Sequence, residues 1–416
     1  MKKLKVGMFI LLALALALTT LVSACSTTPD TPDTPDTPDT PDTPDQPLEL
    51  KIGVSTELTG AMSEAYLPYY RGMQAAAGWI NDAGGLTVNG EQYLIELVAE
   101  DNGATAEGSV EVANKLVYDH KVNFILSTAL SPFVPGEVAV TEEAGVLYEF
   151  NCATGMPDDL SPDKPLTFAG SVLTETLPAC LDYMLEAYPE VSNFAFLYPE
   201  DPSLIWLTDN VMTPEVESRG MTLVAAESYA MGTVDYYPVL TKILAADPDG
   251  IECMGMASWV GGMLKQAREL GFEGPIFSHT DVTDPVVVRD VATAALATNA
   301  FVGTPYVESP TMPEMVQEIA GIMSDDFGET LREEHIRGWE MLWVLAQAIE
   351  KAQSLEPVEV AAAFETMDSF DTPFGTGTMG GMETFGVNHV VLAPQAISSI
   401  MDGEVELVQW FAPSIP

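Results

Sequence analysis

Hydroxyl, acidic and aromatic side chains recur where predicted strands end, and together they have the chemistry to hold a small zwitterion. Ser131 and Thr154 carry hydroxyl groups that can donate hydrogen bonds to a carboxylate. Asp281 carries a negative charge that suits an ammonium group. Flat apolar walls for a hydrocarbon or aromatic side chain are offered by Tyr66, Trp206 and Trp259.

Four further side chains adjoin these residues and complete the predicted ligand site. The serine of Ser131-Pro132 is also typical of a helix start, so this pair predicts the first turn of a helix as well as a ligand contact. The tryptophans could instead be core residues, because tryptophan is highly buried on average. We expect no metal ligand, no cofactor and no catalytic residue in the site. The four adjoining residues are Leu130, Cys152, Met256 and Ala257.

The sequence argues against an enzyme. Gly375–Gly380 spells GxGxxG, but no strand pattern leads into it, and we interpret it as a glycine-rich loop rather than a dinucleotide site. The four histidines are scattered without metal-ligand spacing, and no GxSxG, HExxH or P-loop motif occurs. A hydrolase that used His279 and Asp281 would show turnover, and we expect none.

The elements that must position these residues alternate between strand-like and helix-like segments. Gly84-Gly85 ends a first helix, whose apolar residues from Met73 to Ile80 recur at helical spacing. A long apolar helix is predicted over 331–353, and Asp402-Gly403 predicts a hairpin turn between 390–400 and 404–411. Short apolar runs predict strands at 48–55, 93–99, 123–128 and 146–151, and, in a second series, at 193–198, 222–229, 250–255 and 275–279.

Strands separated by helix-sized connections imply parallel sheets covered on both faces. The two series therefore predict an α/β fold with two doubly wound parallel-sheet lobes. Ligands of open parallel sheets bind beyond the carboxyl ends of the strands. Two facing lobes would bring the candidate residues into one cleft.

The N-terminal residues have the pattern of an export signal. Three lysines precede an apolar run over 9–18, which is too short for a bilayer span of about 20 residues. Leu21–Cys25 resembles a bacterial lipobox, in which the cysteine is lipidated; an ordinary signal with an incidental Cys25 is the alternative. The triplet Thr-Pro-Asp then repeats six times from Thr28 to Asp45 and predicts an extended spacer. We expect an extracytoplasmic domain anchored to the cell membrane by a lipid, in the periplasm or on the outer surface.

The chain is strongly acidic, with 62 acidic and 16 basic side chains and a formal charge of -46. Nucleic acid is therefore an unsuitable partner, because phosphate binding needs clustered lysine and arginine. The cysteines after Cys25 are three in number and show no Cys-x-x-Cys spacing, which favours buried apolar roles, with one disulfide left open.

Several motifs resemble the leucine/isoleucine/valine-binding family of type I periplasmic binding proteins, and they occur in the family's order. In the first half they are Glu57-Leu58-Thr59-Gly60, Ile80–Gly85, Glu100-Asp101-Asn102, Glu142–Val146 and Ala153-Thr154. In the second half they are Val234–Tyr237 and Gly262–Arg268. The resemblance covers nearly all of residues 48–411.

This resemblance implies two lobes joined by a three-crossing hinge that close on a ligand, with Ser131 and Thr154 at positions that hold its carboxylate. The family's ammonium-binding acid aligns at Thr280 or Asp281. It further implies a substrate-binding lipoprotein that delivers an amino acid, branched-chain or otherwise apolar, to the permease subunits of an ABC importer. Relatives without that acid bind aromatic acids or small amides, and the same clamp could report its ligand to a signalling receptor.

The expected division of the chain follows from these motifs. Residues 1–24 form a lipoprotein signal peptide and 25–47 the lipidated cysteine with its linker. The first lobe takes 48–171 and returns over 304–388, the second lobe takes 172–303, and 389–416 form a hinge crossing with the C-terminal hairpin of the second lobe.

Overall fold

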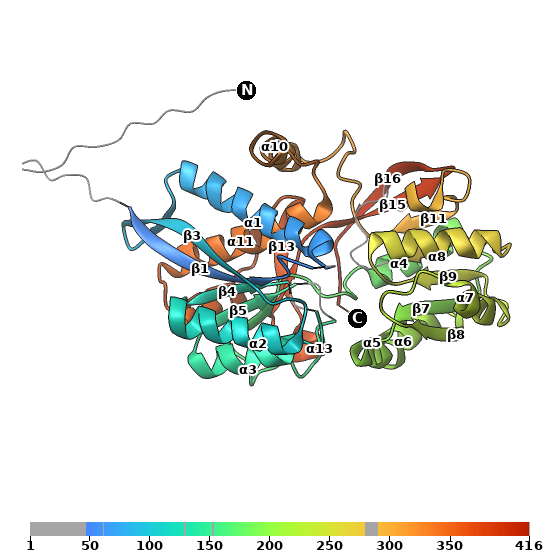
Figure 1. Cartoon of the computed structure of the whole chain (residues 1–416), viewed down its shortest axis with the longest axis horizontal. Coiled ribbons are helices and arrows are strands. Elements are labelled where there is room, and N and C mark those ends of the chain that lie inside the picture. The colour runs from blue at the N-terminus through green and yellow to red at the C-terminus, as the bar shows by residue number, and fades with distance from the viewer. Residues whose placement is uncertain (1–46, 61, 129, 152–153, 279–289, 416) are drawn as a thin grey trace, which may run out of the picture. The chain divides into compact units, whose positions relative to one another are not determined.

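Two α/β lobes make up the described part of the chain, which comprises residues 47–60, 62–128, 130–151, 154–278 and 290–415 of a computed structural model (Figure 1). The first lobe is built on a nine-stranded sheet and the second on a seven-stranded sheet. The leader, the Thr-Pro-Asp repeat and Cys25 lie outside the described residues.

The first sheet has a parallel centre with antiparallel edges. Its strands are β1 (Leu48–Thr56), β2 (Leu86–Val88), β3 (Glu91–Asp101), β4 (Phe124–Ser127), β5 (Leu147–Phe150), β6 (Thr167–Ala169), β12 (Phe370–Thr372), β13 (Gly375–Gly380) and β14 (Val390–Leu392). They are ordered β12-β13-β14-β6-β5-β4-β1-β3-β2. The pairs from β14 through β6, β5, β4 and β1 to β3 are parallel, whereas β2, β12 and β13 pair antiparallel.

Helices cover both faces of this sheet. One face carries α1 (Ser63–Asp82), α10 (Glu314–Ile322), the π-helix η3 (Met323–Phe327), α11 (Glu333–Ala352) and α12 (Pro357–Glu365). The other carries α2 (Ala106–Asn114), the π-helix η1 (Lys115–His120), α3 (Val134–Ala144) and the short α13 (Met382–Phe385). The two faces hold separate apolar cores, as expected for strands buried on both sides.

The second lobe repeats this plan. Its sheet contains β7 (Asn193–Pro199), β8 (Thr222–Tyr229), β9 (Gly250–Cys253), β10 (Ile276–Ser278), β11 (Ala300–Val302), β15 (Gln395–Met401) and β16 (Glu404–Phe411), ordered β16-β15-β11-β10-β9-β7-β8. One face is covered by α7 (Tyr237–Leu244) and α8 (Ala257–Glu269), and the other by α4 (Leu177–Ala187), α5 (Pro202–Leu207), the π-helix η2 (Thr208–Met212) and α6 (Thr213–Ser218).

The chain passes between the two sheets three times. It crosses after β6, returns after β11 and crosses again between β14 and β15. The predicted fold class, with its three-crossing hinge, is confirmed, and antiparallel strands are added at the sheet edges. The lobe boundaries remain a prediction, although β14 belongs to the first sheet and β15 to the second.

Two predictions near the C-terminus have different outcomes. The hairpin at Asp402-Gly403 is confirmed, since β15 and β16 pair antiparallel and both turn residues have positive φ, 51° and 79°. The single strand over 390–400 is wrong, because the run divides between the two sheets at Ala393-Pro394. Proline has no N–H to donate to a ladder, so it is suited to the break.

The glycine-rich loop predicted at Gly375–Gly380 is instead strand β13. A Cβ at Gly377 would lie 2.4 Å from the Phe370 ring, and a Cβ at Gly380 would lie 2.4 Å from Leu392 Cδ1. The glycines are therefore required by the close packing of neighbouring strands. The residues of the GxGxxG pattern therefore lie within a strand and do not form the turn between a strand and a helix that a dinucleotide-binding loop requires.

Close contact between α1 and α11 holds the first lobe together. A Cβ at Gly72 would lie 1.8 Å from the carbonyl oxygen of His335, and a Cβ at Gly338 would lie 1.8 Å from that of Tyr69. The two helices approach through these glycines, so any side chain there must push them apart. This places α11, with its buried Arg337, firmly in the first lobe.

Replacing Gly338 by alanine should lower the free energy of unfolding by about 3 kcal/mol, because the added methyl group overpacks a backbone contact. Chemical denaturation measures this change. Gly78→Ala, on the exposed side of α1 with no atom within 4 Å of the new Cβ, is the matched control and should be neutral or stabilising by up to about 1 kcal/mol. Equal losses in the two variants would contradict the close packing.

Candidate functional site

Three neighbouring strands of the first sheet are tied together beneath their carboxyl ends. Glu137 of α3 accepts hydrogen bonds from Ser55 of β1 (2.5 Å), Ser127 of β4 (2.7 Å) and Tyr148 of β5 (2.5 Å). Burial raises the pKa of the Glu137 carboxyl, and these three donors oppose that rise. The network fixes the strands from which the loops bearing the candidate residues emerge.

Ser131 does not cap a helix, so that prediction is wrong. α3 begins three residues later, at Val134, and Ser131 lies in the preceding turn. Its Oγ accepts the backbone N–H of Thr154 at 2.9 Å and lies 3.0 Å from Thr154 Oγ1. The hydroxyl therefore bonds to Thr154 and not to the first turn of α3, and it joins the loop after β4 to the loop after β5.

A second contact carries this pair to the other lobe. Thr154 Oγ1 lies 2.9 Å from the Oγ of Ser203, near the start of α5. Both the N–H and the hydroxyl of Ser203 donate to Asp201 Oδ1, each at 2.8 Å. Thr154 and Ser203 are both buried, at 2% and 9% exposure.

The contact of Ser203 with Asp201 determines which hydroxyl group donates and which accepts in each contact of this chain. Since Ser203 donates its hydroxyl proton to the Asp201 carboxylate, its Oγ must accept from Thr154. Thr154 must then accept from Ser131. The donors that could hold a carboxylate are thus engaged in a contact between the lobes.

Local sequence explains where Ser203 sits. Asp201 has an extended backbone, φ -148° and ψ 128°, and is the N-cap of α5, with Pro202 as the first helical residue. Ser203 was not among the predicted site residues. The signal that could have found it is the triplet Asp201-Pro202-Ser203 directly after β7, a strand-to-helix junction at the predicted binding edge.

Glu57 is a buried acid at the same edge of the first sheet. It follows β1, and its Oε2 accepts the hydroxyl of Thr128 at 3.1 Å. Burial raises the pKa of Glu57 to about 7, while hydrogen bonds from its own backbone and from Thr128 act in the opposite direction. A carboxyl that is partly protonated near neutral pH therefore lies beside the loop that leads to Ser131.

The three candidate aromatic residues lie on helices at the edges of the cores. Tyr66 is buried in α1, with its ring centroid 6.2 Å from that of Tyr69. Trp259, on α8, is half-buried, and its ring lies 6.2 Å from the Tyr229 ring. Trp206, on α5, is half-buried and packs against the core of the second lobe. Their role as ligand walls remains a prediction.

The remaining candidates divide between described and undescribed residues. Leu130 is half-buried, and its carbonyl oxygen accepts the N–H of Phe133 at 2.8 Å. Met256 precedes α8, and its carbonyl oxygen accepts the N–H of Trp259 at 2.9 Å. Ala257 is the first residue of that helix. The candidates outside the described residues are Cys152 and Asp281, with Cys25 at the predicted anchor.

Other kinds of site are not seen within the described ranges. They contain no group of three or more histidine, cysteine or acidic residues arranged to hold a metal ion. None of their helices has the length and apolar character to cross a membrane. Cys180 and Cys253 are free and buried, as the apolar interpretation of the cysteines predicted.

Comparison with known proteins gives a consistent result. The profile of the periplasmic binding protein family matches residues 49–394. A leucine-, isoleucine-, valine-, threonine- and alanine-binding protein of Pseudomonas aeruginosa is 24% identical over 332 residues, covering 80% of this chain and 85% of that protein. An amino acid binding protein of the same species is 27% identical over 251 residues, covering 59% of this chain and 63% of that protein.

Solved structures share the fold. The branched-chain amino acid transporter substrate-binding protein LivJ from Streptococcus pneumoniae, in complex with isoleucine, superposes with a TM-score of 0.72 at 20% identity, covering 88% of this chain and all (100%) of that one. A solute-binding protein of an ABC transporter from R. palustris, in complex with benzoate, has a TM-score of 0.72 at 16% identity and covers 88% of this chain and 97% of that one. These relatives are binding proteins rather than enzymes.

Removing the Asp201 carboxylate by substitution with alanine should lower the free energy of unfolding by about 1 kcal/mol, because two donors of Ser203 lose their acceptor. Asp201→Asn keeps an acceptor oxygen and should lose less. Thermal unfolding followed by circular dichroism measures both. The control is Asp209→Ala on the exposed side of η2, which should change stability by less than about 0.5 kcal/mol, and a loss there as large as in Asp201→Ala would contradict the role of Asp201.

Proposed function

Because the chain belongs to the periplasmic binding protein family, and within it to the leucine-, isoleucine- and valine-binding proteins, we propose that it is the extracytoplasmic substrate-binding component of an ABC importer and captures an apolar amino acid. The observation that supports this most is the hydroxyl chain from Ser131 through Thr154 to Ser203. It joins strand-end loops of both lobes, which is where a ligand would be held between them.

The carboxylate of the ligand would be held by the first lobe. Ser131 and Thr154 each have one hydroxyl proton to donate, and a charged acceptor makes a stronger hydrogen bond than the neutral Ser203 hydroxyl. An incoming carboxylate would therefore replace Ser203 as the acceptor for Thr154. No arginine is needed in this arrangement, because the two hydroxyl groups lie 3.0 Å apart and both could donate to one carboxylate.

The rest of an amino acid would meet the second lobe and the surrounding apolar side chains. Asp281, which follows β10, is our candidate for the α-ammonium group. The aromatic candidates would enclose an apolar side chain, with smaller neighbours completing the wall. The full proposed ligand-binding set is Tyr66, Leu130, Ser131, Cys152, Thr154, Trp206, Met256, Ala257, Trp259 and Asp281.

The mechanism that fits these parts is closure of a two-state hinge. A ligand that touches both lobes binds the closed form better than the open form, so it shifts the population toward closure. The closed form would then be recognised by the permease subunits of the importer. Cys25 would carry a lipid that anchors the protein to the membrane, with the Thr-Pro-Asp repeat as the spacer.

An aromatic acid is the alternative ligand. The R. palustris neighbours that contain benzoate and 4-hydroxybenzoate have the same fold as this chain, with TM-scores of 0.72. The same hydroxyl pair would hold the carboxylate of such a ligand, but no acid would be required in the second lobe. The two alternatives therefore differ in their need for Asp281.

Thr154→Val should weaken binding of leucine or isoleucine by about 10-fold to 100-fold, because one hydrogen bond to a charged group is lost at nearly constant volume. Isothermal titration calorimetry measures Kd, after a thermal-shift screen of amino acids and aromatic acids at low and high salt identifies the ligand. The control is Thr376→Val at an exposed position of β13, which should leave Kd unchanged. Stabilisation of the wild type by none of these compounds would exclude the proposed function.

Asp281→Asn separates the two ligand classes. If the ligand is an amino acid, the variant should bind it at least about 10-fold more weakly, since an ammonium group loses its charged partner. Binding of benzoate, where it occurs, should be unaffected. Thr280→Ala is the matched test of the neighbouring position, and a larger loss there than in Asp281→Asn would move the ammonium contact to Thr280.

A further inference from the structure

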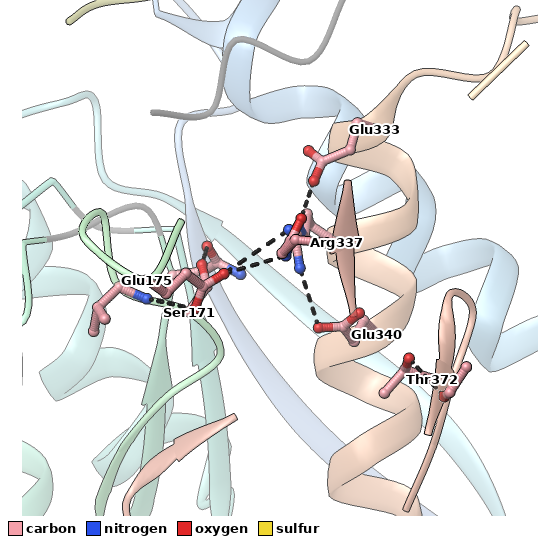
Figure 2. Close-up of polar contacts among 10 residues, drawn as sticks. Ser171, Glu175, Glu333, Arg337, Glu340 and Thr372 are labelled. Atoms are coloured by element: carbon pink, nitrogen blue, oxygen red, sulfur yellow. Dashed lines mark hydrogen bonds and ion pairs between the residues drawn. The ribbon is translucent and has the colours of Figure 1, made fainter. Parts of the chain in front are cut away.

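Arg337 is a buried cation surrounded by carboxyl groups at the place where the chain first leaves the first lobe. Its Nε donates to Glu333 Oε1 at 2.5 Å and its Nη1 to Glu340 Oε1 at 3.4 Å, both on its own helix α11. Its Nη2 lies 3.9 Å from Glu175 Oε1. Figure 2 shows Glu175 and Arg337 pointing toward each other, with Glu333 and Glu340 on either side of the guanidinium.

Glu175 connects this cation to the crossing segments. It lies between β6 and α4, on the first crossing, and its Oε1 also accepts from Gln395 Nε2 at 3.2 Å, where the third crossing enters β15. Its backbone oxygen accepts the N–H of Ser414 at 3.1 Å. Glu175 therefore connects Arg337 of the first lobe to the first and third crossings.

A fourth carboxyl, Glu149 of β5, borders the same place. A Cβ added at Gly170, where the first crossing begins, would lie 2.8 Å from Glu149 Oε1 and 3.2 Å from Met341 of α11. Among the described residues, neither oxygen of Glu149 has a hydrogen-bond partner. The Arg337 cluster is defined here as Arg337, Glu149, Glu175, Glu333 and Glu340, each at most 5% exposed.

The charges of the Arg337 cluster do not balance if every acid is ionised. The Arg337 guanidinium would face the carboxylates of Glu175, Glu333 and Glu340. The Glu149 carboxyl is close enough to Glu340 to be affected by its charge, and the uncharged Phe374 ring lies 5.9 Å from Arg337 Cζ. Uncompensated buried charge is costly, so the cluster must retain protons. Glu175, Glu333 and Glu340 share the Arg337 guanidinium across the joint between α11 and the first crossing.

The ionisation of the individual acids agrees with this geometry. Burial raises the pKa of Glu175 to about 8; Arg337 opposes the rise, and Glu340 and Glu333 add to it. Burial raises the pKa of Glu340 to about 7, with Arg337 again opposing and Glu333 adding. Burial, and then the charge of Glu340, raise the pKa of Glu149 well above its usual range.

We propose that the Arg337 cluster is a proton-linked joint of the hinge, which stays packed while its carboxyls hold protons and loosens when they ionise. Loosening lets water reach the carboxylates, and this requires the first crossing to move away from α11. Because the same crossing carries the second lobe, proton loss favours the open arrangement of the lobes.

The direction of the pH effect follows from the raised pKa values. Between the ordinary glutamate pKa near 4.5 and the folded-state values of about 7 and 8, the folded chain holds more protons than the unfolded chain. The contribution of these groups to the free energy of unfolding is fully present below pH 4.5. It falls as the pH rises through this window and is lost above about pH 8.

Thermal unfolding of the purified chain from pH 5 to pH 9 tests the proton linkage. Glu175→Gln and Glu340→Gln imitate the protonated acids, so each should resist the alkaline loss and melt about 3 °C or more above the wild type at pH 9, while differing little at pH 5. Glu359→Gln, which changes the same charge at an exposed position of α12, should follow the wild type. Parallel curves for all four proteins would overturn the proposal.

Small-angle X-ray scattering without any ligand tests the link to the hinge. The radius of gyration of the wild type should increase from pH 6 to pH 9, and that of the double variant Glu175→Gln/Glu340→Gln should increase less. A purely structural role for the cluster would change the melting curves alone, so equal scattering of both proteins at both pH values would overturn the joint. Because no ligand is present, this outcome does not depend on the proposed amino acid binding.

Discussion

The contact between the hydroxyl groups of Thr154 and Ser203 joins the two lobes. The two hydroxyls belong to loops from different sheets, and they meet at 2.9 Å only because three chain crossings hold those sheets together. Each loop is in turn set by its own strand end: Glu137 ties the strands beneath Ser131 and Thr154, and Asp201 caps the short helix that presents Ser203. The binding site that we propose is divided between two folded units, and such a site can respond to a ligand because neither unit contains all of it.

Acidic side chains play two different physical roles in this chain. The chain has 62 acidic and 16 basic side chains, and water solvates those carboxylates that are exposed, so they contribute little to the stability of the fold. A few are buried where desolvation is severe, at the ends of β1 and β5 and beside Arg337, and there burial favours the protonated form. The net charge therefore bears on solubility. The buried acids instead lie at the edge of the candidate site and beside the hinge crossings.

Sequence patterns predicted the order of the elements well and their roles less well. β8 was predicted at its observed bounds, 222–229. Ser131-Pro132 has the spelling of a helix start, yet the hydroxyl bonds to a threonine 23 residues away. The glycine-rich pattern of Gly375–Gly380 is typical of a loop, yet these residues form a strand whose glycines leave space for Phe370 and Leu392.

The sequence by itself determined the alternation of strands and helices, the division into two α/β lobes, the C-terminal hairpin and the family resemblance, because these depend on local periodicity, turn chemistry and motif order. Tertiary structure decided that Ser203 meets Thr154, that 390–400 divides between two sheets, and that Glu175 reaches Arg337 from 162 positions earlier in the chain. Such pairings join residues far apart in the chain through the packing of whole sheets and helices. No local pattern encodes them, since the same serine, glutamate or arginine is equally acceptable at a solvated surface.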